Sequence, residues 1–147
     1  MTVNESKVFS IEASPKEVLD VLADVESLPD WWDGYKSIEV LERDESNRPL
    51  RTKASLKSGT MADEQVLVYT WHDDGVSWTL EKSKLQRAQE VRYTLTPDGD
   101  GTTVKFDVLL EPMVRLPAFL MKRGTEMLMK TATEDLRGQV LKGKSGR

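Results

Sequence analysis

The sequence predicts an α+β fold in which a curved, seven-stranded antiparallel sheet wraps around one long C-terminal helix. Three observations lead to this prediction. A strand-like segment at the start of the chain is followed by two short helical segments. Six further strand-like segments then follow with short connections, which favours an antiparallel meander. The sequence ends with one amphipathic stretch that is long enough to cover the whole sheet.

The length and the Cys content limit the class of protein. A chain of 147 residues can bury a core large enough to fold without disulfide or metal cross-links, so we expect residues 1–147 to form a single domain. The basic end, residues 143–147, is expected to be a flexible tail. The sequence contains no Cys, which excludes disulfides, thiolate metal sites and cysteine nucleophiles and agrees with a reducing compartment.

Charge and hydropathy narrow the range of partners. The 21 basic and 25 acidic residues give a net charge of −4, and the basic residues are scattered along the chain. A nucleic-acid footprint usually needs a positive stripe, so no nucleic-acid partner is expected. The sequence has no run of 18 apolar residues and no leader-like start, so we expect a cytoplasmic protein without an integral membrane segment. The oligomeric state stays open.

The N-terminal elements have clear local signals. Residues 3–12 alternate, with Phe9 and Ile11 on one side, as in an edge strand with one buried face. The run Ser14-Pro15-Lys16-Glu17 then supplies a cap, a Pro in the first turn and a Glu three residues after the Ser, a capping box that begins a helix. Another Ser and Pro indicate a second short helix, which ends in Leu28-Pro29-Asp30-Trp31-Trp32.

Turn signals divide the middle of the chain into six strands. These are expected at Tyr35 to Asp44, Leu50 to Lys57, Met61 to Trp71, Val76 to Lys82, Arg87 to Thr96 and Thr102 to Glu111. The third of them is apolar on both faces. We expect Leu67, Tyr69 and Trp71 to point inward, because larger groups fill a concave face better; the alternative is a central strand covered on both sides.

The final helix is expected from about Leu116 to Leu141, with Pro117 tolerated in its first turn. Its apolar stripe consists of Leu116, Leu120, Gly124, Met127, Leu128 and Thr131, and drifts toward Ala132, Leu136 and Val140. At a rise of ~1.5 Å per residue this helix is roughly 38 Å long, about the diameter of a compact chain of this size. We therefore expect the sheet to close on this helix.

Several of these segments together resemble a known superfamily. They are the run from Ile11 to Asp24, the run from Leu28 to Trp32 that leads into Ser37 to Leu41, the segment Gly101 to Val104, and the terminal helix. In these features the chain resembles the SRPBCC superfamily of polyketide cyclases, START lipid-transfer domains and plant pathogenesis-related allergens, which share the helix-grip fold. The resemblance covers essentially the whole chain, but the shared positions build the scaffold. Similar proteins include lipid and sterol carriers, cyclases, quinone-binding chaperones and activators of a protein chaperone.

A sheet bent strongly around one helix is hard to fill, so we expect a ligand cavity between the two. Its expected lining is Trp31, Trp32, Tyr69, Trp71, Trp78, Tyr93, Phe106, Leu120, Gly124 and Met127. An ordinary filled core is the alternative for the aromatic residues, and at least one of the two adjacent Trp residues is expected to anchor its helix. Gly in a helix interior, at position 124, suggests a close backbone approach or a bend.

The expected function is to bind or carry an apolar or amphipathic small molecule, such as a lipid, a polyketide-like or an isoprenoid compound. One alternative is a polyketide cyclase or dehydratase, whose acid or base candidates are Tyr69, Tyr93, Glu64 and Arg92. Another is a partner-binding module, similar to a chaperone activator, with an exposed apolar patch on the outer face of the sheet at Val66 and Val68.

The pattern of polar residues indicates no catalytic site. Candidates for an inward polar group are Asp63, Glu64, Gln65, Arg87, Gln89, Glu90 and Arg92, and the sequence leaves open which of them point inward. His72 is the only His and lies beside a turn, so no metal site and no cofactor are expected. A phosphate-binding Gly loop, an HExxH helix, a CxxC pair and a Gly-x-Ser-x-Gly elbow are all missing from the sequence.

Overall fold

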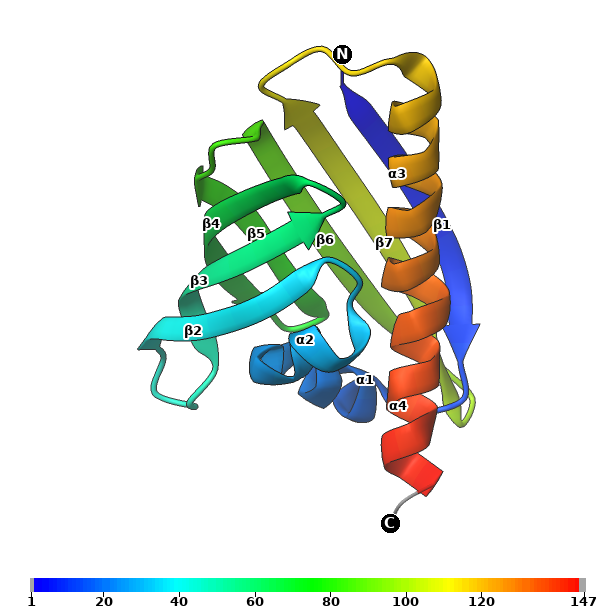
Figure 1. Cartoon of the computed structure of the whole chain (residues 1–147). Helices are drawn as coiled ribbons and strands as arrows, with labels where there is room; N and C mark the ends of the chain where they lie inside the picture. Colours follow the sequence, from blue (N-terminus) through cyan, green and yellow to red (C-terminus); the bar gives the residue numbers. More distant parts are fainter. Residues whose placement is uncertain (1, 146–147) are drawn as a thin grey trace.

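The computed structural model describes residues 2–145 and confirms the predicted α+β fold (Figure 1). One antiparallel sheet has the strand order β1-β7-β6-β5-β4-β3-β2. The strands are β1 Val3–Ile11, β2 Tyr35–Arg43, β3 Pro49–Ser58, β4 Met61–His72, β5 Gly75–Lys82, β6 Gln86–Asp98 and β7 Gly101–Pro112. Strands β2 to β7 pair in chain order and β1 pairs with β7, so the expected meander and the expected first edge strand are confirmed.

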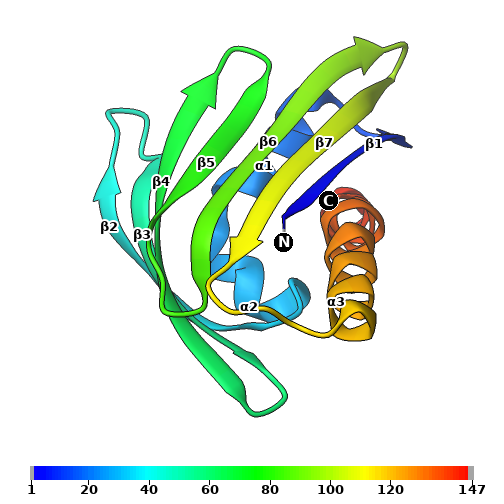
Figure 2. The ribbon, with the colours of Figure 1, turned by 90° about the horizontal axis from the view of Figure 1, so that it is seen from above.

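All helices lie on the concave side of the sheet (Figures 1 and 2). They are α1 Pro15–Ala23, α2 Leu28–Trp31, α3 Ala118–Lys130 and α4 Leu136–Ser145, with a short 3-10 turn at Val25–Ser27 and a π-helical turn at Thr131–Asp135. Helices α1 and α2 lie across one end of the concave side. Helices α3 and α4 form one continuous rod that runs beside β1 and β7.

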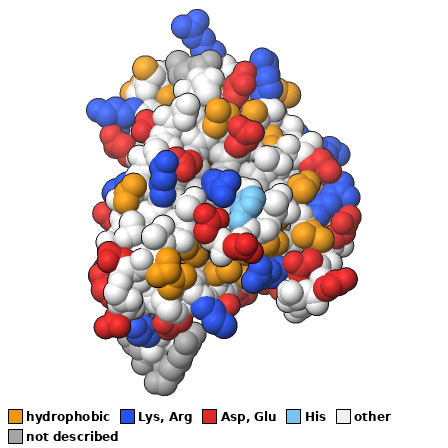
Figure 3. All heavy atoms as spheres, turned by 180° about the vertical axis from the view of Figure 1, so that it is seen from behind, with side chains coloured by type: hydrophobic (Ala, Val, Ile, Leu, Met, Phe, Trp, Pro, Cys, Tyr) orange, Lys and Arg blue, Asp and Glu red, His pale blue; other side chains and the backbone are white. Residues whose placement is uncertain are grey.

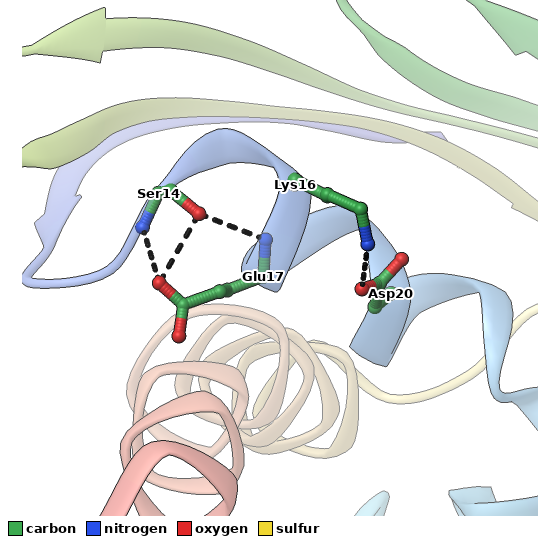
Figure 4. A network of polar contacts seen from close by, with 4 residues as sticks. All are labelled: Ser14, Lys16, Glu17 and Asp20. Carbon is green, nitrogen blue, oxygen red and sulfur yellow. Dashed lines mark hydrogen bonds and ion pairs between the residues drawn. The ribbon is translucent and has the colours of Figure 1, made fainter.

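The predicted capping box begins α1 (Figure 4). The backbone amide of Glu17 donates to the Oγ of Ser14 over 3.2 Å, and the backbone amide of Ser14 donates to the Oε1 of Glu17 over 3.1 Å. Lys16 forms an ion pair with Asp20 one turn later, 2.9 Å away. Two amides that would otherwise lack a partner are thereby satisfied, which fixes where the helix starts.

The core lies between the sheet, α1 and the second half of the C-terminal rod. Ala132, Leu136 and Val140 are buried there together with Val18 and Leu22 of α1. These side chains belong to one cluster with the inward apolar residues of the sheet. The spacing of the three rod residues by four is that of a helix with a single buried stripe.

The C-terminal rod departs from the predicted helix in three ways. It begins at Ala118, with Pro117 as its N-terminal cap, rather than at Leu116. A π-helical turn, Thr131–Asp135, interrupts the α-helical pattern in its middle. Helix α4 continues to Ser145, so residues 143–145 of the expected flexible tail are helical, whereas 146–147 lie outside the described residues.

Candidate ligand-binding site

A row of aromatic side chains crosses the concave face of the sheet from β4 to β7. Ring centroids lie 5.4 Å apart for Tyr69 and Trp78, 5.9 Å for Trp78 and Tyr93, and 4.9 Å for Tyr93 and Phe106. Trp71 stacks on Tyr69 at 6.3 Å. Each strand presents alternate residues to one face, so neighbouring strands place these rings side by side. The five sheet aromatics of the predicted lining are therefore brought together.

The inward face of β4 is the predicted one. Leu67 and Tyr69 are buried in the core cluster, and Trp71 packs against it. Val66, on the opposite face, is only 8% exposed because its cross-strand neighbours are the long side chains of Lys53 and Lys82. The strand is thus covered on both sides, and the exposed outer patch expected for a partner-binding module is not formed at Val66.

The aromatic row is already packed where it meets the C-terminal rod. Tyr93 and Phe106 are completely buried. The hydroxyl of Tyr93 donates a hydrogen bond to the carbonyl oxygen of Ala132, 2.7 Å away. Burial raises the pKa of Tyr93 well above its ordinary value. In this half of the interior, Tyr93 and Phe106 are therefore part of the buried core cluster.

The two adjacent Trp residues of α2 form a second aromatic group. Trp31 and Trp32 are half-buried against the core, with ring centroids 5.6 Å apart, and Trp32 meets the edge of Tyr35 at 6.3 Å. The indole nitrogen of Trp31 donates to the Oγ of Ser27 over 3.1 Å, which anchors the short helix. Burial raises the pKa of Tyr35, and Tyr69 adds to this effect; both tyrosines belong to the same core cluster. Contact of either Trp with a ligand stays a prediction.

Helix α3 differs from the rest of the rod because it contains no buried residue. Its half-buried side chains are Met121, Thr125, Leu128 and Met129, and the last two touch the core cluster. The three residues predicted to line a cavity, Leu120, Gly124 and Met127, are exposed, with Leu120 at 41% and Met127 at 49%. A Cβ added at Gly124 would meet no atom within 4 Å, so the expected close approach does not occur there.

The concave face holds polar side chains whose inward position the sequence left open. Asp63 and Gln65 are buried, and alternation places them on the same face of β4 as Leu67 and Tyr69. On β6, Gln89 shares the face of Val91, and its Oε1 has no hydrogen-bond partner among the described residues. Side chains alternate between the two faces of a strand, so counting every second residue from those predicted to point inward assigns these polar side chains to the concave face.

The carboxylate of Asp63 stabilises the turn between β5 and β6. Its carboxylate accepts hydrogen bonds from the hydroxyl of Ser83, the backbone amides of Lys84 and Glu64, and the side-chain amide of Gln65. Burial acts to raise the pKa of Asp63, but these four hydrogen bonds outweigh it and hold the pKa below its usual range. The group is an ionised acceptor, which disfavours it as a proton donor at neutral pH.

The charged acid and base candidates point away from the interior, which corrects the sequence prediction. Glu64 is exposed and pairs with Lys53 at 3.0 Å, and Arg92 is exposed and pairs with Asp74 at 3.5 Å. Both alternate with inward residues along their strands, so they lie on the outer face. The face seen from behind in Figure 3 carries acidic and basic side chains side by side, and the single His, whose Nε2 lies 2.8 Å from the Oγ of Ser77, is among them.

Two open hollows lie at opposite ends of the sheet. The larger, about 500 Å³, is lined by Arg87, Glu111, Pro112, Met113, Val114 and Arg115, beside the connection from β7 to α3. The smaller, about 340 Å³, is lined by Ser10, Ile11, Glu12, Asp98, Asp100, Gly101, Thr102 and Lys144. Neither contains any of the ten residues predicted to line a cavity.

Among the described helices, none has the length and apolar character needed to cross a membrane.

A curved antiparallel sheet held around a long C-terminal helix defines a helix-grip protein. The sequence profile of the Polyketide cyclase / dehydrase and lipid transport family matches residues 11–137, and the chain belongs to this family. None of the curated protein sequences compared with the chain matches it significantly.

Solved structures share the fold over nearly the whole chain. A START superfamily protein from Mycobacterium smegmatis has a TM-score of 0.83 at 20% identity, covering 95% of this chain and 97% of that one. The Zhui aromatase/cyclase from a Streptomyces species has a TM-score of 0.68 at 12% identity, covering 95% and 94%. The ginseng major latex-like protein 151 from Panax ginseng has a TM-score of 0.68 at 10% identity, covering 95% and 98%. At these identities the similarity concerns the fold alone.

Proposed function

We propose that the protein binds an apolar or amphipathic small molecule, of lipid, polyketide-like or isoprenoid type, between the concave face of the sheet and α3. One observation carries the proposal. Helix α3 has no buried residue, whereas the same rod buries Thr131, Ala132, Thr133, Leu136 and Val140 further along. The first 13 residues of the rod therefore lie beside the sheet with no side chain fully buried, and only Leu128 and Met129 reach the core.

Apolar surface is available on both sides of this region. The sheet contributes Leu56, Leu80 and Leu110, and α3 contributes Leu128 and Met129, all of them only partly buried. A ligand that buried 300 Å² of apolar area there would gain roughly 7 kcal/mol at ~25 cal/mol per Å², before the entropy lost on binding. An apolar ligand bound between the sheet and α3 would bury the apolar surface that these side chains leave partly exposed.

The polar groups of the concave face favour an amphipathic ligand. The amide of Gln89 has an unpaired oxygen that can accept a hydrogen bond from a ligand hydroxyl. The family description includes both cyclases and lipid transport. Binding is favoured over catalysis because Glu64 and Arg92, the two charged catalytic candidates, lie on the outer face, where no ligand inside the fold reaches them.

A matched pair of variants on one strand tests the proposal. Native mass spectrometry of freshly purified protein is expected to reveal an apolar adduct, and a dansyl-labelled fatty acid is expected to bind with increased fluorescence. Leu80→Gln, on the concave face, should weaken binding of this probe about tenfold, because a polar group replaces apolar contact. Thr79→Gln, its neighbour on the outer face, should leave the affinity unchanged. Absence of both adduct and probe binding, or an equal effect of the two variants, would refute the proposal.

A further inference from the structure

Exposed apolar side chains are concentrated on one segment of the molecule. Among the described residues, eight large hydrophobic side chains are exposed, and five of them lie within residues 113–127. These five are Met113, Val114, Phe119, Leu120 and Met127. Phe119 is 68% exposed, more than any other residue in this group. Single exposed apolar residues need no explanation, but a cluster of this kind marks an interaction site.

The same segment is basic in an acidic protein. Residues 113–130 contain four basic side chains and one acidic one, a net charge of +3, whereas the whole chain carries −4 and the remainder therefore −7. Lys130 pairs with Asp135 at 3.1 Å. Within the described part of the chain, Arg115, Lys122 and Arg123 form neither an ion pair nor a side-chain hydrogen bond. Three cations are thus left free to meet an external anion.

Helical spacing places the apolar and basic groups together. Phe119, Arg123 and Met127 follow one another at intervals of four residues, so they share one face of α3. This face is turned away from Thr125 and Leu128, which are half-buried. The open hollow of about 500 Å³ adjoins the same surface at the start of the rod. An apolar and basic face of this kind, on a helix without buried residues, matches helices that lie in a membrane interface.

We propose that the exposed side of residues 113–130 docks on an anionic lipid bilayer, with Phe119 among the acyl chains and Arg115, Lys122 and Arg123 at the headgroups. A second copy of the chain fits this surface poorly, because a two-fold interface would set a patch of +3 against an identical one. Anionic headgroups and acyl chains, in contrast, match both components of the surface at once. The docking does not depend on whether the interior holds a ligand.

The proposal is tested by sedimentation of the purified protein with vesicles. Vesicles of phosphatidylcholine mixed with phosphatidylglycerol are expected to bind the protein at low salt, and pure phosphatidylcholine vesicles much less. Arg123→Glu should lower the partition coefficient at least roughly tenfold, because one attraction is removed and one repulsion is added. Lys36→Glu, an exposed basic residue on β2, is the matched control and should have a smaller effect.

A second pair of variants separates apolar insertion from charge. Phe119→Ser should lower binding to the mixed vesicles roughly tenfold, whereas Val8→Ser should not, although Val8 on β1 is 62% exposed. Circular dichroism verifies that every variant is folded. Failure to bind the mixed vesicles at low salt would overturn the proposal, as would equal losses in the variants and their controls. Self-association, or binding to an acidic protein, that Phe119→Ser abolishes while vesicles do not bind would assign the surface to that partner instead.

Discussion

The hydroxyl of Tyr93 on β6 donates a hydrogen bond to the carbonyl oxygen of Ala132, 2.7 Å away, inside the π-helical turn of the C-terminal rod. In a regular α-helix this carbonyl would accept from the amide of Leu136. That amide instead donates to the carbonyls of Thr131 and Thr133, so a side chain of the sheet takes the place of the missing helical donor. The contact fixes the point at which the rod meets the sheet, immediately after the part of the rod that has no buried residue.

Tyr93→Phe should therefore destabilise the protein by about 1–3 kcal/mol, because the buried carbonyl of Ala132 is left without its tyrosine donor. Tyr35→Phe is the matched control, since the hydroxyl of Tyr35 forms no hydrogen bond with any described residue, and it should change stability much less. Urea denaturation of the wild type and both variants measures the difference. Equal costs for the two variants would show that the hydrogen bond is not what holds the π turn.

All three tyrosines of the chain are buried, which predicts a steep loss of stability in alkali. Burial raises the pKa of Tyr69 to about 12, and it raises the pKa values of Tyr35 and Tyr93 as well. Tyrosines in the unfolded chain ionise near pH 10. The stability that comes from keeping the buried tyrosines neutral is therefore fully present below that pH and is lost as the pH rises above it. Three tyrosines together make the loss about 4 kcal/mol per pH unit in this window.

The measurement is a pH titration that follows tyrosinate absorbance and circular dichroism in parallel. Both signals should change together, because tyrosinate forms only when the chain unfolds. A separate ionisation step in protein that is still folded would contradict the burial of at least one of the rings.

Two glycines should respond to alanine in opposite directions. A Cβ at Gly75, whose φ is +151°, would lie 1.9 Å from the backbone oxygen of Tyr93, so Gly75→Ala should cost more than about 2 kcal/mol. At Gly124 the added Cβ meets nothing within 4 Å, so Gly124→Ala should raise stability by about 0.5–1 kcal/mol through helix propensity. Thermal unfolding of the two variants measures both effects, and a destabilised Gly124→Ala protein would reveal a contact that the structure lacks.

Asp63→Asn should destabilise the protein at neutral pH by about 2 kcal/mol, because four donors converge on this carboxylate and an amide cannot accept from all of them. The pKa of Asp63 is lowered in the folded state, so its contribution is present above the pKa of the unfolded chain and is lost as the pH falls below about 4. The cost of the substitution should shrink accordingly at pH 3.

Chemical denaturation at pH 7 and at pH 3 tests this dependence. Glu64→Gln, next to it but on the exposed outer face, serves as the control and should change stability little at either pH. A cost for Asp63→Asn that stays constant between the two pH values would mean that the charge of the carboxylate does not stabilise the turn.

Local signals in the sequence were sufficient for most of the fold. The six middle strands begin and end within two residues of their predicted limits, and the capping box at Ser14 forms as expected. Residue size also identified the inward face of β4. Alternation along the strands also indicates that Glu64 and Arg92, two of the acid or base candidates, lie on the outer face, as the structure shows.

The sequence by itself thus determined the order of the elements, the antiparallel pairing of strands joined by short turns, and the aromatic content of the concave face, because these depend on periods of two and 3.6 residues and on contacts between chain neighbours. Only the tertiary structure decided that the rod buries side chains from Thr131 onward and none before it, that a π turn begins at this boundary, and that Leu120 and Met127 are exposed. The angle and rotation of a helix against a sheet follow from long-range packing, which a residue pattern within the helix does not contain.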